Sequence, residues 1–498
     1  MKIASCILLY IIFFGLSAAV NPITGTVRDV ETGEKLPFAN VVVEGQNTGT
    51  ISNADGDFVL DVEGLEKDQL IVFTFMGYET LKIPLNKLQE MKAVELKPAI
   101  INLNELAVYS RQLTAKDILD RVKENYEKNH PRVDSKQRIF YHKYEKTLWP
   151  RENELVLKSS NFVGLDRATV EDLFSKIPEE FVEYHDAMVD LYSLDGEKKL
   201  KVVEAVSLEE GSMQDLQKEV EQKLKGFFED FENTQGDPDI YYKFRTGIFA
   251  QKIDDDELEP DSIQIEQKKD SLNYLVSTNH LRSSIQRVIR NWADIGSKNW
   301  EFIDKTSRYD YSLGDVTIFN DELVYPITFT PQRKGLFEGV IYISTSTFGI
   351  LQLDYAFAEG KSDENIQILG FGHSTEFKRA RVIYERTELG YFVKYINAEQ
   401  KERAAINRDF SVMKKEKRFL WDKELNELRM SIDLDFNMSL NLELLILDQE
   451  PVDTVEFKQL TQEKITRFRK EYVWTPEMWN NRTVIAPSAE LREYTRKK

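Results

Sequence analysis

The hydropathy pattern begins with one positive charge followed by a long apolar run. Lys2 precedes residues 3–20, which are almost wholly apolar, and small residues occupy positions 17–19. Signal peptidases accept small side chains at −3 and −1, so the pattern predicts a secretory signal peptide over residues 1–19, cleaved after Ala19. The alternative is an uncleaved membrane anchor, because about 18 apolar residues is near the lower limit for spanning a bilayer. The small residues at the exit favour cleavage.

Residues 23 to 109 alternate between apolar and polar positions in short runs. Turn residues such as Gly33, Gly45, Asp55-Gly56 and Gly77 separate these runs. A period of two predicts half-buried strands, and several short strands at such spacing predict a β-sandwich. The expected strands are 23–27, 39–43, 58–62, 70–75 and 80–85, with 96–98 and 103–109 as the last strand and the exit.

Three later segments carry apolar residues at helical spacing. In the first, Thr114 and Asp117 form a capping box and Pro131 ends the helix. In the second, Ser212 and Asp215 form the cap. The expected apolar faces are Ile118, Leu119, Val122 and Tyr126 in the first helix, Leu216, Val220, Leu224, Phe227, Phe228 and Phe231 in the second, and Leu281, Ile285, Val288, Ile289 and Trp292 in the third.

The second and third apolar faces have two interpretations. A membrane surface or a partner could cover them, but such a face more often packs on the protein's own sheet, and we expect that arrangement. The third helix also carries Arg282, Arg287 and Arg290 in an acidic chain. These arginines could bind an anionic headgroup, although pairing with local acidic residues on a solvated face is favoured.

Residues 300 to 446 are rich in short strand-like runs separated by polar turns. Consecutive strands with tight links predict an antiparallel, curved sheet. The expected strands are 324–329, 339–344, 350–357, 381–385 and 391–396.

The C-terminal segment is rich in aromatic residues and proline, over residues 472–479 and 484–487. We expect it to wrap the domain as irregular chain, with its tryptophans in surface grooves. A tail that docks on a partner is the alternative.

These patterns predict a multidomain protein, with an N-terminal all-β sandwich followed by an α+β region that has a curved antiparallel sheet and amphipathic helices. About 480 residues remain after cleavage, which is enough for two to four domains. The expected boundaries are 1–19 for the signal peptide, 20–110 for the sandwich, 111–295 for a mixed helix and strand region, and 296–498 for the β meander with its aromatic tail.

Charge narrows the possible partners. The formal net charge is −19 and the isoelectric point is near 5.0, and losing Lys2 makes the mature chain one unit more negative. Such a surface repels phosphate backbones, which argues against nucleic acid, and it disfavours anionic lipid except at local basic patches. The aromatic share of 11% argues against a disordered chain. We expect no transmembrane segment in the mature chain, which leaves peripheral outer-membrane association open.

The single cysteine, Cys6, lies inside the expected signal peptide. It stands near the start of the apolar run instead of after it, which argues against a lipoprotein signal. The mature chain would then have no disulfide, no thiol nucleophile and no thiolate metal site. A large bacterial envelope protein can do without disulfides.

Recognisable catalytic motifs are absent from the sequence. It contains no Gly-x-Ser-x-Gly elbow and no phosphate-binding glycine loop. His185 and Asp186 could join a catalytic triad only with a distant serine. Paired carboxylates for glycoside hydrolysis depend on a separation in space, so the 85 acidic residues are not evidence for them. No two of the five histidines have the spacing of a metal-binding helix: His130, His142, His185, His280 and His373.

Two acidic segments could attract a cation. Residues 254–257, with Glu259 and Asp261, could collect Ca²⁺, but they lack the alternating ligands and central glycine of a calcium loop, so a solvated loop is favoured. Asn53, Asp55 and Asp57 could do the same, although a hairpin turn is favoured. We therefore predict no catalytic residue, no metal ligand, no cofactor-binding residue and no cofactor.

A series of short motifs in the N-terminal region resembles the carboxypeptidase-regulatory-like domain. The resemblance implies a prealbumin-type sandwich, which is common at the N-terminus of Gram-negative outer-membrane nutrient receptors and related envelope proteins. In that family the module is an accessory fold without catalytic residues, so peptidase activity is not implied. The motifs are Gly25-x-Val27-x-Asp29, Thr32-Gly33, Leu36-Pro37-Phe38-Ala39-Asn40-Val41, Gly49-Thr50-x-Ser52, Asp55-Gly56-x-Phe58 and Met76-Gly77-Tyr78.

Two weaker resemblances concern the remainder. The helix that stops at Asn129-His130-Pro131, with the aromatic strand 140–144, is similar to a group of poorly characterised envelope proteins. Some of those continue into a membrane β-barrel, whereas no run of amphipathic barrel strands is expected before Lys498, so a transport role of the barrel is not implied. The strands from 327 to 351 look like the half-barrel of lipoprotein carriers, in which helices and a curved sheet enclose an apolar cavity.

Three functions remain open. The first is a non-enzymatic exported envelope protein, periplasmic or associated with the outer membrane or cell surface, that binds a partner or supports assembly. The second is a carrier of lipid or another apolar ligand, and the third is a hydrolase. A filled core with an exposed aromatic patch would favour the first, an apolar cavity under the helices the second, and converging catalytic groups the third.

Overall fold

The structure is a computed structural model that describes residues 22–46, 48–100, 113–209, 211–234, 237, 239–247, 249–253, 272–479 and 485–492. The chain divides into two compact units. The sandwich unit comprises Met1–Ala99 and Thr475–Ala489, and the sheet unit comprises Ile100–Trp474 and Glu490–Lys498. The expected signal peptide, the exit 103–109 and the acidic segment 254–261 lie outside the described residues.

The sandwich unit contains the predicted β-sandwich. One sheet has the order β4-β1-β7 and the other β3-β2-β5-β6. Buried and exposed positions alternate, so that Val27, Val41, Phe58 and Phe73 share one core in which Phe58 and Phe73 meet edge to face at 5.5 Å. The elements are β1 (Ile23–Asp29), β2 (Asn40–Val43), β3 (Gly49–Ile51), β4 (Asp57–Leu60), β5 (Leu70–Thr74), β6 (Leu81–Pro84), the short helix α2 (Leu85–Leu88) and β7 (Ala93–Leu96).

Asp29 and Tyr78, both from the motif series, act together at one turn. The Asp29 carboxylate accepts hydrogen bonds from the backbone N–H of Glu31 at 2.7 Å and of Thr32 at 2.8 Å. The Tyr78 hydroxyl donates to the other carboxylate oxygen at 2.6 Å. Tyr78 and these N–H groups lower the pKa of Asp29, because they favour the charged form. Asp29 and Tyr78 therefore stabilise this turn of the sandwich.

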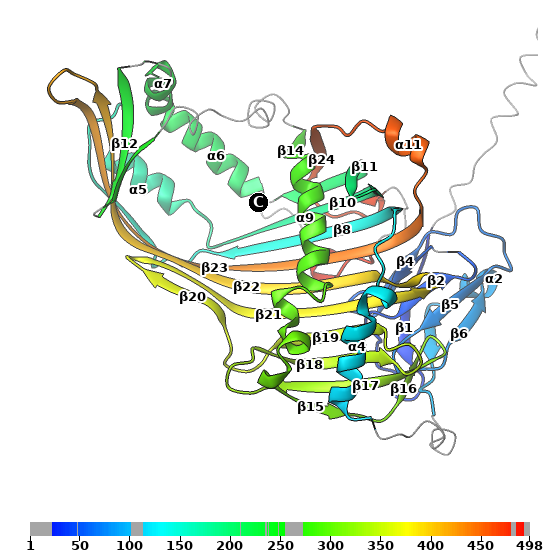
Figure 1. The fold of residues 1–498 in the computed structure, drawn as a ribbon. Helices are drawn as coiled ribbons and strands as arrows, with labels where there is room; N and C mark the ends of the chain where they lie inside the picture. The colour runs from blue at the N-terminus through cyan, green and yellow to red at the C-terminus, as the bar shows by residue number, and fades with distance from the viewer. Residues whose placement is uncertain are drawn as a thin grey trace, which may run out of the picture. The chain divides into compact units, whose positions relative to one another are not determined.

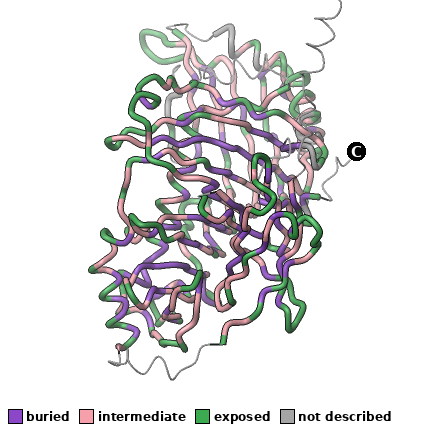
Figure 2. The backbone as a smooth tube through the Cα atoms, turned by 90° about the vertical axis from the view of Figure 1, so that its right-hand side faces the viewer, coloured by how far each residue is buried: buried purple, intermediate pink, exposed green. Residues whose placement is uncertain are grey.

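The sheet unit is built on one large, curved and unclosed sheet (Figure 1). Its bent strands run side by side, and buried segments alternate with exposed edges and turns (Figure 2). The strands are β8 (Ser135–Leu148), β9 (Glu154–Ser160), β10 (Glu180–Leu194), β11 (Glu197–Glu209), β12 (Ile240–Thr246), β13 (Phe249–Ile253), β14 (Asn273–Ser277), β15 (Tyr309–Leu313), β16 (Thr317–Phe319), β17 (Glu322–Pro331), β18 (Phe337–Ser344), β19 (Ile350–Phe357), β20 (Asp363–Ile368), β21 (Phe371–Thr387), β22 (Gly390–Glu416), β23 (Lys423–Pro451) and β24 (Ile465–Glu471).

Strands from both sides of the expected boundary at 295/296 lie in this one sheet. From β17 to β23 neighbouring strands are antiparallel, as the meander predicted. β8 then pairs with β23 on one side and with β10 on the other. β24 runs parallel to β11 and antiparallel to β14. The two halves of this unit are therefore joined by long-range strand pairing.

The first and third predicted helices are present, as α4 (Ala115–Asn129) and α9 (Thr278–Trp292). The capping box forms, because Thr114 Oγ1 accepts from the Asp117 N–H at 3.2 Å and Asp117 accepts from the Thr114 N–H at 2.9 Å. Both apolar faces are buried, and α9 packs across β11, β14, β22, β23 and β24. Among the described residues, no helix has both the length and the apolar character needed to cross a bilayer.

The second predicted helix is divided in two, which corrects the expectation of one continuous helix. The chain forms α6 (Gly211–Lys223) and α7 (Lys225–Thr234), separated at Leu224. Gly226 favours a break because glycine is a poor helix former. Phe227 packs edge to face on Phe162 at 5.3 Å. The remaining helices are α5 (Arg167–Ser175), α10 (Glu301–Asp304), α11 (Thr454–Gln459), α12 (Ala489–Arg492) and the 3-10 turns η2 (Lys298–Trp300), η3 (Thr306–Arg308) and η4 (Pro476–Trp479).

An aromatic core fills the space below the C-terminus of α9. Phe302 stacks on Phe329 with ring centroids 4.2 Å apart. The Trp300 indole N–H donates to the Trp292 carbonyl at 2.9 Å, and the Tyr384 hydroxyl donates to the Ala293 carbonyl at 2.8 Å. The last carbonyls of a helix have no partner within the helix. Buried aromatic side chains therefore donate hydrogen bonds to the free carbonyls at the end of α9 and also fill the core.

Candidate functional site

His185 and Asp186, the pair considered for a triad, do not act together. As neighbours on β10 they lie on opposite faces of the sheet. His185 pairs with Glu183 at 3.5 Å and stacks on Tyr274 with ring centroids 5.0 Å apart. Asp186 instead contacts His142 on the neighbouring strand, β8. Among the residues that the structure describes, His185 and Asp186 are therefore not joined in one triad.

His142 and Asp186 form a buried polar pair. The His142 Nδ1 atom lies 2.5 Å from Asp186 Oδ1, and Glu443 is opposite His142 on β23. Burial pushes the pKa of His142 down, but the two carboxylates more than offset this and raise it to about 9. Glu443 also accepts hydrogen bonds from Tyr395 and Asn397. Since the Asp186 side chain is only 7% exposed, the pair is enclosed and links β10, β8 and β23.

His130 is also enclosed, but its ring is uncharged at pH 7, whereas that of His142 is charged. Its ring stacks on Tyr126 at 4.6 Å, and its Nε2 atom accepts from the Ile350 N–H at 3.4 Å. Burial lowers the pKa of His130 to about 4, so the ring is neutral at pH 7. His130 thus packs the end of α4 against the sheet.

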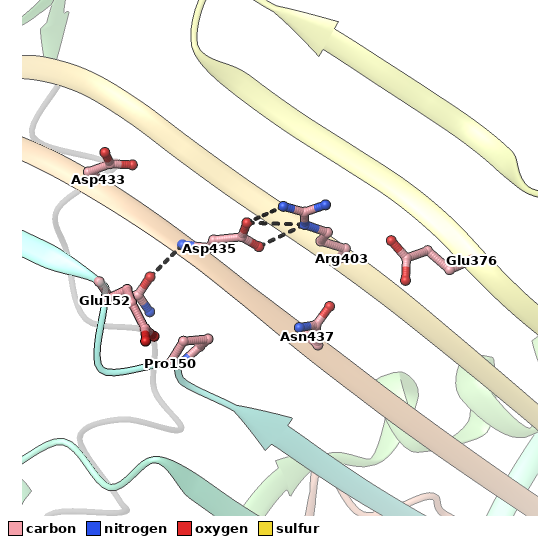
Figure 3. A pocket seen from close by; sticks show the side chains of 8 residues that line it. Pro150, Glu152, Glu376, Arg403, Asp433, Asp435 and Asn437 are labelled. Carbon is pink, nitrogen blue, oxygen red and sulfur yellow. Dashed lines mark hydrogen bonds and ion pairs between the residues drawn. The ribbon is translucent and has the colours of Figure 1, made fainter.

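The sheet unit carries an open polar groove. It has a volume of about 490 Å³ and lies where the loop between β8 and β9 leaves β23 (Figure 3). Alternate residues of β23 face it, because side chains in a strand repeat every two residues. Its lining contains no histidine, serine or cysteine: Pro150, Glu152, Asn153, Glu376, Arg403, Asp433, Asp435 and Asn437.

Arg403 and Asn153 hold the centre of the groove in place. Arg403 donates through Nε to both Asp435 oxygens, at 2.9 and 3.1 Å, and this interaction lowers the pKa of Asp435 (Figure 3). The Asp435 N–H donates to Asn153 Oδ1 at 2.6 Å, so the loop between β8 and β9 is tied to β23 at this point. The Asn153 side-chain nitrogen is buried and has no hydrogen-bond partner within the described structure.

The groove offers carboxylate acceptors and amide donors, which suits a hydroxylated or basic polar ligand. Within the described residues, no cluster of three or more histidine, cysteine or acidic side chains is placed to hold a metal ion. Sequence reasoning missed the groove, although Asp433, Asp435 and Asn437 alternate with Leu434 and Phe436. Reading residues 430–441 as a strand would have placed the three polar side chains on one face.

The second cation candidate, at Asn53 and Asp55, binds the chain's own C-terminal segment. Asn53 Oδ1 accepts from the N–H groups of Asp55 and Asp57, each at 2.9 Å, as a hairpin turn requires. Its Nδ2 atom donates to the carbonyls of Ala486 at 3.2 Å and Pro487 at 3.1 Å. Asp55 accepts from the Ala489 N–H at 3.0 Å. Residues 486–489 of the C-terminal segment thus pack on the N-terminal sandwich through this turn.

Replacing Asn53 with aspartate should loosen the tail and leave the turn intact. The carboxylate keeps the acceptor for Asp55 and Asp57, but it loses the donor and faces two carbonyl oxygens, at a cost of about 1–2 kcal/mol. Hydrogen exchange of residues 485–489 should accelerate about tenfold. Asn86→Asp, at an exposed position, is the matched control and should leave this exchange rate unchanged. Unchanged exchange in Asn53→Asp would show that these bonds do not retain the tail.

Comparison with known proteins concerns mainly the N-terminal region. Residues 23–108 match the family described as CarboxypepD_reg-like domain. TonB-dependent receptor SusC of Bacteroides thetaiotaomicron is 41% identical over 76 residues, which cover 15% of this chain and 7% of the receptor. TonB-dependent receptor P39 of Formosa agariphila is 29% identical over 106 residues, covering 21% of this chain and 10% of the receptor. The chain spans only a small part, 7–13%, of such relatives.

A likeness among solved structures is much weaker. The crystal structure of MucB in complex with MucA(peri) covers 68% of this chain and 100% of its own at 9% identity, with a TM-score of 0.17, which is too low to support an argument about fold or function. The resemblance of the larger region to uncharacterised envelope proteins stays a prediction. For the N-terminal region, the motif series, the sandwich and the family match agree: residues 23–108 match the CarboxypepD_reg-like domain, and the chain is similar over 76–133 residues to TonB-dependent receptors.

Proposed function

We propose that this chain is an exported, non-enzymatic protein of the cell envelope that works by binding. In this proposal residues 20–110, after a cleaved signal peptide, are an interaction module, and the sheet unit binds a polar partner through the groove on β22 and β23. The groove itself is the main observation in support of this proposal. It is open and charged, its centre is fixed by Arg403 and Asn153, and its lining has no nucleophile.

The ligand that best fits the groove is a segment of another envelope protein with basic side chains. Glu152, Glu376 and Asp433 supply negative charge, and the only cation in the lining, Arg403, is already paired with Asp435. Complementary charge favours a basic partner, because it speeds encounter and disfavours acidic competitors.

Site-specific photo-crosslinking in envelope preparations tests this role. A photoreactive residue in place of Asn437, inside the groove, should capture a defined partner. The same residue in place of Glu338, an exposed position on β18, should not. Adding Glu376→Lys and Asp433→Lys should abolish the capture from position 437. Equal capture from both positions, or capture that survives the charge reversal, would refute the groove as the binding site.

A carrier function is the second candidate, because an apolar row follows the opposite face of β23. Ile432, Leu434, Phe436, Met438 and Leu440 are all partly exposed, although Trp149 stacks on Phe436 at 5.7 Å. Native mass spectrometry with organic extraction of gently purified mature protein separates the two functions. A mass equal to that of the polypeptide is expected. A stoichiometric lipid or other apolar molecule would instead favour the carrier.

A further inference from the structure

The turn between β22 and β23 exposes three large apolar side chains in succession. β22 and β23 are 27 and 29 residues long, and Figure 1 places their turn beside β12, away from α4 and α9. The exposed fractions are 102% for Phe419, 74% for Leu420 and 78% for Trp421. Isolated surface hydrophobics are common, but three consecutive ones that include tryptophan indicate an interaction site.

The turn is held in a fixed place. β12 pairs with β22 up to Glu416, and the Lys417 N–H donates to the Asp239 carbonyl at 2.7 Å. The Tyr241 hydroxyl donates to Asp422 on the other side of the turn. The apolar residues 419–421 therefore project from a braced hairpin, and little ordering entropy would be lost when they bind.

Positive charge surrounds the apolar residues. Lys415, Lys417 and Arg418 precede them and Lys423 follows, in a chain whose formal net charge is −19. Two of the nearby acids are engaged, since Glu416 accepts from Arg418 at 3.1 Å and Asp422 accepts from Tyr241. The third, Glu424, lies opposite Lys415 in the strand pairing. Tryptophan, phenylalanine and leucine next to lysine and arginine are the composition of segments that bind at the boundary between headgroups and acyl chains.

We propose that residues 417–423 form a lipid anchor that inserts Phe419, Leu420 and Trp421 into the surface of a phospholipid bilayer with anionic headgroups. A bilayer suits this surface better than a protein partner does. A protein interface buries about 800 Å² on each side around a central patch, whereas this turn is narrow and convex. A convex apolar tip can enter a bilayer boundary, and the flanking cations then remain at headgroup level.

The lipid anchor adds a membrane contact to the proposed envelope role. It rests on the proposed function only in one respect, namely that the protein is located in the envelope. The groove and the turn lie on the same two strands, with Arg403 and Asp435 in the middle of the hairpin and Trp421 at its end. Anchoring the turn would hold the groove at a distance from the bilayer that the hairpin sets. Because lipid binding and partner capture are measured separately, one can fail while the other holds.

Vesicle binding by the mature protein tests the anchor. The probe is vesicles of phosphatidylethanolamine with about a quarter of phosphatidylglycerol. The substitution Phe419→Ser, Leu420→Ser and Trp421→Ser together should weaken binding at least about thirtyfold, because three apolar side chains no longer leave water. Lys417→Gln with Arg418→Gln should weaken it about threefold on these vesicles and not on phosphatidylcholine vesicles. Leu389→Ser is the control, since Leu389 is 65% exposed just before the opposite end of β22, and it should bind as the wild type does.

Fluorescence quenching by brominated lipids locates the contact. Wild-type protein should be quenched on binding, whereas Trp421→Phe should keep its binding and lose most of the quenching. Equal vesicle binding by the wild type and the triple serine variant would overturn the proposal. So would quenching that persists in Trp421→Phe, or a wild type that does not bind vesicles. Circular dichroism and the melting temperature of each variant check that the fold is retained.

Discussion

Replacing Trp300 with alanine is expected to lower the free energy of unfolding of the sheet unit by about 4 kcal/mol. The side chain is fully buried, and its indole N–H donates to the Trp292 carbonyl at 2.9 Å. Its ring meets Tyr126 edge to face at 6.5 Å, and so it connects α4, the end of α9 and the aromatic core. Alanine would leave a cavity that neighbouring rings cannot fill.

Urea unfolding followed by near-ultraviolet circular dichroism measures this loss, and hydrogen exchange of α9 assigns it to the sheet unit. Trp421→Ala provides the matched control, because it removes the same side chain from a position that is 78% exposed. It should change the free energy by less than about 0.5 kcal/mol. A loss below about 1 kcal/mol for Trp300→Ala would mean that the core under α9 is not packed as described.

Asp186→Asn is expected to destabilise the sheet unit by about 3 kcal/mol at pH 6. Asparagine keeps the shape of the side chain but removes the charge that faces His142 at 2.5 Å. The imidazole would then be buried without its main counter-charge, and its pKa would fall. Urea unfolding of the wild type and the variant at several pH values measures the difference. Glu338→Gln, at an exposed position, should have no effect at any pH.

The difference between wild type and Asp186→Asn should shrink as the pH rises. The pKa of His142 is raised from 6.5 to about 9 in the folded protein, so its stabilising contribution is complete below 6.5 and lost as the pH passes about 9. His130 acts in the opposite sense, because its lowered pKa removes stability as the pH falls from 6.5 towards 4, but both proteins share this effect. An equal difference at pH 6 and pH 10 would contradict the assigned charge state of His142.

Features determined by neighbouring residues could be predicted from the sequence. The capping box at Thr114 and Asp117, the apolar face of α9 and the turns of the sandwich each depend on residues close together in the chain. The break at Leu224 was missed, since the apolar period continues across it and only Gly226 signals an interruption. The antiparallel order from β17 to β23 followed from short connections between successive strands.

Pairings between distant residues could not be predicted. Nothing local to residues 135–148 indicates that β8 pairs with β23, and the contacts of Asn53 with the tail join positions 433 and 434 residues apart. The pair of His142 and Asp186 depends on the register between β8 and β10, and the groove depends on the loop that leaves β23. The composition of a single segment carries no information about such partners.

The late pairing partners have a consequence for the order in which the fold can form. A chain that emerges from its N-terminus presents β8 long before β23, and it presents the Asn53 turn long before Ala486. Neither the large sheet nor the contacts of Asn53 can therefore be completed until residues 423–451 and 486–489 have followed. During that interval the long strands have unpaired edges, which favour aggregation. Under the export that we propose, this interval falls after the N-terminal half has been translocated, so the unpaired strands would wait for their partners outside the cytoplasm.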